Sequence, residues 1–289
     1  MSTATETATL AGLVDELTPR LAPALGGAAQ SETRRLVCLA TGADRTRLVV
    51  APDAPVDPAA AARARALAER RAAGEPFAYL AGTREFWGLD FAAGPGVLVP
   101  RPESETMIEA ALAHLPADRP ARVLDLGTGS GCLLLTVLHE RPRAFGLGVE
   151  RSAAALVYAE RNRRALGLAP RSGLIRASWL DAVGGRFDLV LANPPYIPAA
   201  EIDALMTDVR DFEPRLALDG GDDGLAPHRL ILARLADRLA PGGLALFEIG
   251  HEQGAAALAA AAAAGFAGGH LLRDLGGRDR CLAVPAPAG

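Results

Sequence analysis

The residues whose types and spacing most clearly suggest chemistry are Asn193-Pro194-Pro195-Tyr196, which follow the apolar run FDLVLA. Each proline fixes its own φ angle and favours an extended conformation in the residue before it. The side-chain oxygen of Asn193 and the carbonyl oxygen of Pro194 would then form a rigid pair of acceptors, and Tyr196 could stack on a flat substrate. A planar NH2 group, on an amide or an adenine, carries the two N–H donors that such a pair accepts.

The nitrogen of such a group is a poor nucleophile because its lone pair is delocalised. The site must therefore hold it in line with an electrophile and stabilise the charge that develops. After transfer the nitrogen is acidic enough to lose its proton without a dedicated base, so the lack of a histidine beside this tetrad is no objection. The alternative interpretation is an ordinary proline turn after a strand.

A glycine-rich segment, GTGSG at residues 127–131, follows Asp125 and a strand-like run and opens a predicted helix. Glycines at such a turn let a nucleotide-like ligand approach the backbone closely. A dinucleotide-binding segment would have its third glycine at position 132, where this chain has Cys132. The loop therefore favours S-adenosyl-L-methionine, which has no pyrophosphate, over NAD.

Glu150 ends the next predicted strand, 23 residues after Gly127 (150 minus 127). A carboxylate at this place can accept hydrogen bonds from both ribose hydroxyls of a nucleoside. The alternative is a solvated acid that caps the helix expected to begin near Ser152.

After Arg122 the chain alternates apolar segments with amphipathic segments, and these must position the residues described above. This rhythm predicts an α/β fold, Rossmann-like, with a mostly parallel, doubly wound sheet covered on both faces. Candidate strands around His270–Arg273 and Cys281–Val284 could close the sheet as its last pair. The glycine loop, Glu150 and the tetrad should then meet at one edge of the sheet.

The N-terminal part of the chain has a helical pattern from residue 4 to about 82, with Leu10, Leu13 and Leu17 on one face. We expect a small helical bundle domain over 1–85 and a second domain over 86–289. Aromatic, β-branched and glycine residues near 83–100 predict a hairpin-like linker between the two.

Composition limits the possible partners and compartments. The net charge of −4 and the pI near 5.8 argue against a partner held mainly through phosphates, so no direct nucleic-acid binding is expected. The N-terminus lacks a secretory pattern, and the apolar segment 255–267 is shorter than the ~20 residues of a membrane span, which predicts a cytoplasmic protein. Cys38, Cys132 and Cys281 lack metal-ligand spacing.

Seven segments from about Gly74 to Arg280 resemble the release factor glutamine N5-methyltransferases, the PrmC or HemK type of class I methyltransferase. In that family the helical N-terminal domain helps to grip a class I peptide-chain release factor, and the methyl acceptor is the glutamine of its Gly-Gly-Gln loop. The segments keep the family's order and spacing: GEPFAYLAGTREFWGLDF, VLVPRPESE, VLDLGTGSG, NPPYI, FEPRLALDGGDDGL, LAPGGLALFEIGHEQ and DLGGRDR.

The resemblance implies a role for each matching residue. Asn193, Pro194, Pro195 and Tyr196 would hold the glutamine amide, and Asn193, Pro194 and Tyr196 would be catalytic. Trp179 would lie against the adenine, although a tryptophan between strands is also typical of a core. The cofactor would contact Gly127, Thr128, Gly129, Ser130, Gly131, Glu150, Trp179 and Asn193.

Three residues depart from the family pattern. Glu150 stands where aspartate is usual, which could change affinity but not the role. Ser178 stands where an aspartate commonly precedes the position of Trp179, which removes a possible acceptor for the adenine amino group. Ser104 replaces a threonine in the PRPETE-like segment and keeps the hydroxyl.

Other polar residues have two interpretations. Glu103 and Glu105 could line the site or cap the helix expected to start near them. Glu213 and Arg215 could form a substrate-side pair or a surface salt bridge. A lone histidine such as His251 is more often structural than catalytic.

Three alternative functions remain open. An N6-adenine nucleic-acid methyltransferase would use the same kind of tetrad after base flipping, although the acidic balance counts against it. A regulator could retain the cofactor site without catalysis. The acceptor could also be a glutamine of another protein, or a small molecule.

Overall fold

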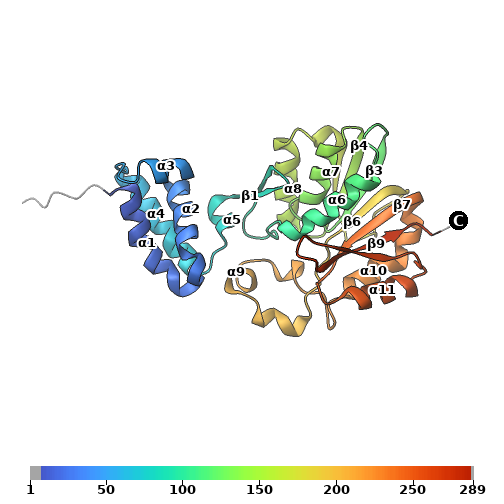
Figure 1. The fold of residues 1–289 in the computed structure, drawn as a ribbon. Helices are drawn as coiled ribbons and strands as arrows, with labels where there is room; N and C mark the ends of the chain where they lie inside the picture. Colours follow the sequence, from blue (N-terminus) through green and yellow to red (C-terminus); the bar gives the residue numbers. More distant parts are fainter. Residues whose placement is uncertain (1–7, 288–289) are drawn as a thin grey trace, which may run out of the picture. The chain divides into compact units, whose positions relative to one another are not determined.

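The computed structural model describes residues 8–287, which form two compact units (Figure 1). The first unit comprises the residues up to Ala81 together with Thr207–Phe212, and the second comprises Gly82–Met206 and the residues from Glu213 onward. Residues 4–7 of the expected helical region lie outside the described residues.

The first unit is a bundle of helices with its own apolar core, as the sequence pattern predicts. The threonine hydroxyl of Thr9 caps the first helix by accepting the Gly12 N–H at 3.1 Å, and Asp57 caps the fourth helix, which begins with Pro58. The helices are α1 (Leu10–Leu25), α2 (Ala29–Thr41), α3 (Arg45–Val50), α4 (Pro58–Ala72) and α5 (Phe77–Ala81), with the 3-10 turn η1 (Gly26–Ala28).

A short segment from late in the chain completes the first unit. It contains α9 (Thr207–Arg210). The Arg71 guanidinium lies 3.7 Å from the Asp208 carboxylate, and a Cβ at Gly74 would come within 2.7 Å of the Thr207 side chain. No local sequence pattern predicts that this segment joins the first unit, because it is 126 residues from Ala81 (207 minus 81).

The second unit opens with the predicted hairpin, formed by β1 (Thr83–Phe86) and β2 (Leu89–Ala92). Trp87 and Gly88 have φ angles of +54° and +72°, which is the conformation of a two-residue type I′ turn. A domain boundary at residue 85 would cut through β1, so the compact unit begins slightly earlier, at Gly82.

A seven-stranded sheet in the order β5-β4-β3-β6-β7-β9-β8 follows. The first five strands in that order are parallel, and β9 runs antiparallel to both of its neighbours, β7 and β8, which confirms the mostly parallel sheet and its closing pair. The strands are β3 (Ala121–Leu126), β4 (Ala144–Glu150), β5 (Ser172–Arg176), β6 (Phe187–Ala192), β7 (Leu239–Glu248), β8 (His270–Arg273) and β9 (Asp279–Pro285).

Helices cover both faces of this sheet (Figure 1). Alternate strand residues face opposite cores: Val123 packs with α6 and α7, and Leu124 packs with α10 and α11. None of the helices in residues 8–287 is long and apolar enough to span a membrane. The helices are α6 (Glu105–His114), α7 (Cys132–Glu140), α8 (Ala153–Ala165), α10 (Ala226–Leu235) and α11 (Gly254–Ala263), with turns η2 (Pro102–Ser104), η3 (Ala169–Arg171), η4 (Ala199–Ala204), η5 (Arg215–Ala217) and η6 (Ala236–Arg238).

Candidate active site

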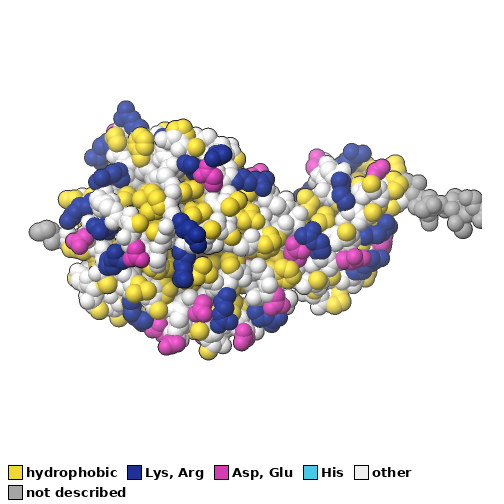
Figure 2. Space-filling model, turned by 180° about the vertical axis from the view of Figure 1, so that it is seen from behind, with side chains coloured by type: hydrophobic (Ala, Val, Ile, Leu, Met, Phe, Trp, Pro, Cys, Tyr) yellow, Lys and Arg dark blue, Asp and Glu magenta, His cyan; other side chains and the backbone are white. Residues whose placement is uncertain are grey.

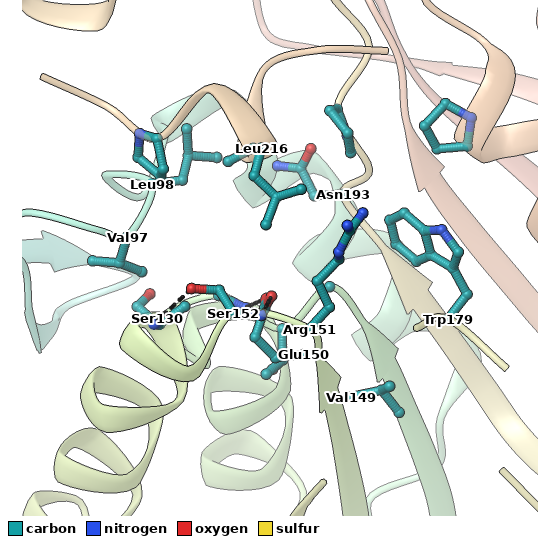
Figure 3. Close-up of a pocket in the computed structure, with 18 of the residues that line it drawn as sticks. Val97, Leu98, Ser130, Val149, Glu150, Arg151, Ser152, Trp179, Asn193 and Leu216 are labelled. Carbon is teal, nitrogen blue, oxygen red and sulfur yellow. Dashed lines mark hydrogen bonds between the residues drawn. The ribbon is translucent and has the colours of Figure 1, made fainter. Parts of the chain in front are cut away.

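Three neighbouring strands end at the same edge of the sheet and bring the predicted site residues together. Leu126 of β3 is paired with Val149 of β4 and with Ala192 of β6. The glycine loop, Glu150 and the tetrad follow these positions directly. They surround a cavity of about 370 Å³ (Figure 3), which is also lined by the segments 96–101, 149–152, 177–179 and 219–221.

The glycine loop turns back over β4. The N–H groups of Gly127 and Thr128 donate to the carbonyl oxygen of Val149 at 2.8 and 3.0 Å. Gly127 has a φ of +74°, and a Cβ there would lie 3.2 Å from the ring of Trp179. Residues 127–130 line the cavity, whereas Gly131 only leads into α7. At Gly127 and Gly129 the loop therefore presents backbone without a side chain to the cavity.

Asp125, the last residue but one of β3, stabilises this loop through its side chain. Its carboxylate accepts the Thr128 hydroxyl at 2.6 Å. Burial raises the pKa of Asp125 to about 7, although the Thr128 hydrogen bond acts in the opposite direction. No sequence motif predicted this role for Asp125.

Glu150 lines the cavity and joins the glycine loop to the next helix. One carboxylate oxygen accepts the Gly129 N–H at 3.0 Å and the other accepts the Ser152 N–H at 2.7 Å. The cap of α8 itself is Ser152, whose hydroxyl accepts the Ala155 N–H at 3.2 Å. Each carboxylate oxygen keeps a second lone pair, so Glu150 can still accept ligand hydroxyls.

Trp179 has both of the expected positions, because it lines the cavity and also packs against the core of the sheet. Figure 3 shows its side chain on the opposite side of Arg151 from Glu150. Its φ of +45° lies in the left-handed region, which costs a residue with a Cβ about 1–2 kcal/mol. Such strain persists only where the surroundings hold it in place. Ser178 lines the cavity beside it.

Asn193 and Pro195 of the tetrad line the cavity, but Pro194 and Tyr196 are not among the lining residues. Pro194 is buried. The carbonyl oxygen of Tyr196 accepts the Gln253 amide at 2.8 Å, which fixes the backbone after the two prolines. A stacking role for the Tyr196 ring stays a prediction.

The loop at residues 218–224 packs against the chain just after the tetrad and holds it in place. The Ile197 N–H donates to the Leu218 carbonyl at 3.1 Å, and the Gly220 N–H donates to the Ile197 carbonyl at 2.9 Å. At Gly224, where φ is +75°, a Cβ would lie 2.2 Å from the Tyr196 carbonyl oxygen. Only glycine allows this close approach.

A series of buried, hydrogen-bonded side chains extends from Asn193. The Asn193 amide donates to the Ser104 hydroxyl at 3.4 Å, and Ser104 donates to the carboxylate of Glu248. The Tyr196 hydroxyl lies near the same carboxylate. Burial raises the pKa of Glu248, and burial together with the Glu248 charge raises the pKa of Tyr196. Sequence reasoning missed Glu248, for which an acid within the apolar run LALFEIG is the only signal.

Three other candidates lie away from the cavity. The carboxylate of Glu105 accepts the Trp87 N–H at 3.2 Å and so braces the hairpin turn. Glu103 does not line the cavity. His251 is exposed and lies 3.7 Å from Glu252.

The expected pairing of Glu213 with Arg215 is wrong. Glu213 is buried and accepts the Arg101 guanidinium at 2.7 Å. Arg215 lies 3.3 Å from Asp219 instead. Residues two apart do not face one another when the chain turns helically, and Arg215 begins η5.

The fit of a nucleoside cofactor can be judged from these contacts. A glycine-rich loop, a carboxylate at the end of the next strand and an aromatic ring together line one cavity, and within residues 8–287 no cluster of metal-ligating side chains is found. The groups suit a sugar and a purine rather than a pyrophosphate. This fold and this site define a class I S-adenosylmethionine-dependent methyltransferase.

Comparisons with known proteins narrow the class. Residues 13–82 match the model of the PrmC N-terminal domain, and residues 103–210 match that of the methyltransferase small domain. The release factor glutamine methyltransferase of Cereibacter sphaeroides is 46% identical over 270 residues, 93% of this chain and 96% of the relative. That of Bradyrhizobium diazoefficiens is 45% identical over 240 residues, 82% of this chain and 81% of the relative. The chain therefore belongs to the release factor glutamine methyltransferase family.

A solved structure shows the same fold at lower identity. The 16S rRNA methyltransferase of T. thermophilus, solved in complex with AdoMet and guanosine, is 20% identical and has a TM-score of 0.52. The match covers 71% of this chain and 50% of that chain.

Proposed function

We propose that this protein transfers the methyl group of S-adenosyl-L-methionine to the side-chain amide nitrogen of the glutamine in the Gly-Gly-Gln loop of class I peptide-chain release factors. The observation that carries the proposal is the position of Asn193, on the wall of the same cavity as the glycine loop and Glu150. Relatives with this name at 45–46% identity support it. We place the activity in the cytoplasm, where translation termination occurs.

The residues of the cavity support this proposal. S-adenosyl-L-methionine, when bound, supplies an electrophilic methyl group on a cationic sulfur. Residues 127–130, Glu150 and Trp179 would hold it, and the Asn193 side-chain oxygen with the Pro194 carbonyl would accept the two N–H donors of the glutamine. Holding the nitrogen in line in this way is worth about 7–11 kcal/mol of the barrier.

The charge distribution counts against the alternative function, an N6-adenine nucleic-acid methyltransferase. The net charge is −4, and Figure 2 shows arginine and acidic side chains interspersed over the visible face rather than gathered by sign. Nucleic-acid sites usually gather basic side chains. The charge distribution fits a release factor and any other protein that presents a glutamine equally well. We expect the first unit, 1–81, to select the partner protein.

The test is methylation of a recombinant release factor by the purified protein in the presence of S-adenosyl-L-methionine. Peptide mass spectrometry should find a gain of one methylene group at the Gly-Gly-Gln glutamine, and Asn193→Ala should lose at least about 100-fold in rate because the acceptor for the amide is gone. A release factor with glutamate in place of that glutamine is the matched control. An unmodified glutamine in the presence of a protein that binds the cofactor would refute the proposal.

A further inference from the structure

Glu248 is a buried carboxylate that the chemistry proposed above does not use. It is the last residue of β7, it is 1% exposed, and it lies beside Asn193 because Phe247 is paired with Ala192 of β6. A carboxylate inside a protein loses several kcal/mol of hydration, so it persists only where hydrogen bonds and opposite charge replace the water. Ser104, Tyr196 and Arg280 supply these partners.

The proton of the Ser104 hydroxyl decides which way Asn193 faces. A serine hydroxyl has one proton, and in this structure it is donated to Glu248. Toward Asn193 the oxygen of Ser104 therefore offers only a lone pair. Asn193 must turn its NH2 group toward Ser104, and the distance of 3.4 Å between the Asn193 nitrogen and the Ser104 oxygen agrees with this.

The orientation of the Asn193 amide has a direct consequence at the cavity. When the NH2 group faces Ser104, the side-chain oxygen is the atom left for a ligand, and Asn193 lies on the cavity wall (Figure 3). An acceptor at that place can bind an N–H of the substrate amide. The reversed orientation would present two N–H groups to the N–H groups of the substrate, and the contact would be repulsive.

We propose that Glu248 and Ser104 are positioning residues that hold the Asn193 amide with its oxygen toward the substrate, and that ionised Glu248 is required for this. The inference rests on the proposed function for the identity of the substrate. The Tyr196 hydroxyl also lies near this carboxylate.

Protonation of Glu248 would reverse the chain of donors. A neutral Glu248 could donate to Ser104, and Ser104 could then donate to the oxygen of Asn193. Burial raises the pKa of Glu248 above that of an exposed glutamate, so the transfer rate should fall with acid before ordinary carboxylates titrate. The charged and titratable groups that face Glu248 are Arg280 and Cys281 on β9, Tyr196 after β6, Glu103 in η2, Cys132 on α7 and His228 on α10.

The experiment compares Ser104→Ala, Ser104→Thr and Glu248→Gln with the wild-type enzyme. We expect Ser104→Ala to lower kcat/KM for the release factor about tenfold or more, and Ser104→Thr to restore it because the hydroxyl returns. Glu248→Gln should lower it at neutral pH and remove the acid limb of the pH profile. Ser172→Ala, which removes another buried hydroxyl far along the sheet, should stay within about twofold of wild type.

A second readout needs no acceptor protein. The side-chain NH2 resonances of Asn193, identified by their loss in Asn193→Ala, should move in Ser104→Ala and in Glu248→Gln but stay close to wild type in Ser172→Ala. Unchanged resonances in Ser104→Ala, or wild-type kcat/KM with a wild-type pH profile in both Ser104→Ala and Glu248→Gln, would overturn the inference. If the wild-type protein leaves the release factor unmodified while the two variants still show these shifts, the result counts against the proposed function alone.

Discussion

Glu150 illustrates how one side chain can serve the loop and the ligand together. Its two oxygens already accept backbone N–H groups from Gly129 and Ser152, so the carboxylate is held rigidly at the cavity wall. A rigid acceptor loses little entropy when a ligand hydroxyl binds to it. This rigidity suits Glu150 to the binding of a ligand hydroxyl at the cavity wall.

We predict that Glu150→Ala weakens the binding of S-adenosylhomocysteine about 10- to 100-fold, because hydrogen bonds to a charged group are worth about 1.5–3 kcal/mol. Titration calorimetry measures the change. Glu160→Ala is the control, since Glu160 pairs with Arg163 and Arg164 on α8 and does not line the cavity. Equal affinity in the two variants would refute the role.

Asp125 gives a pH dependence of stability whose sign can be worked out. Burial raises the pKa of Asp125 to about 7, whereas the unfolded chain releases this proton near the ordinary value of 3.8. Between these values the folded state holds the extra proton, so its stability falls as pH rises and the loss is complete above about pH 7. Asn at this position has the same shape and does not titrate.

Asp125→Asn should therefore gain stability relative to wild type as pH rises from 5 to 8, by about 2 kcal/mol. Urea unfolding of both proteins at the two pH values measures this difference. If the difference between the two proteins were the same at pH 5 and pH 8, Asp125 would not be protonated in the folded state.

At the scale of elements, the tetrad depends on the loop that clamps it. Gly224 and Gly242 have nearly the same φ, +75° and +74°, but a Cβ at Gly224 would lie 2.2 Å from the Tyr196 carbonyl and one at Gly242 would meet nothing within 4 Å. The two sites thus separate a steric clash from the backbone strain that both share.

Gly224→Ala should lower the free energy of unfolding by about 2 kcal/mol more than Gly242→Ala, because the clash adds to the strain of a left-handed alanine. Equilibrium unfolding in urea gives both values. Methyl transfer should also fall in Gly224→Ala and stay unchanged in Gly242→Ala. Equal losses of unfolding free energy in the two variants would show that the loop around Gly224 accommodates the added Cβ without a clash.

The sequence predicts the parts of the site that follow from local pattern. Strand rhythm placed the glycine loop, Glu150 and the tetrad at one edge of the sheet, because the carboxyl ends of parallel strands share that edge. It could not predict that Ser104 meets Glu248, since these residues are 144 positions apart and hydrogen-bond partners leave no periodic signal. The return of Thr207–Phe212 to the first unit was hidden for the same reason.

At the scale of the whole molecule, the cavity belongs to the second unit alone, and the first unit has a separate core. A ligand in the cavity should therefore stabilise the two units unequally. At a concentration 100 times its Kd, a ligand stabilises the state that binds it by about 2.7 kcal/mol.

We predict that saturating S-adenosylhomocysteine slows amide hydrogen exchange in the glycine loop and in β3, β4 and β6, by up to about 100-fold where exchange requires unfolding of the second unit. Amides of residues 8–81 should exchange as in the free protein. Mass spectrometry of peptides from the full chain gives both rates. Uniform slowing across both units would contradict this independence.

The place of Glu248 along the chain also affects when a newly made copy of this protein becomes competent. Synthesis proceeds from the N-terminus, and domains begin to fold as they emerge. Tyr196, the last residue of the tetrad, is made 52 residues before Glu248 (248 minus 196). A nascent chain thus holds every residue expected to touch the methyl donor and the glutamine before it holds the carboxylate that orients Asn193. Until residue 248 has been added, the growing chain would hold the tetrad without the carboxylate that orients its asparagine.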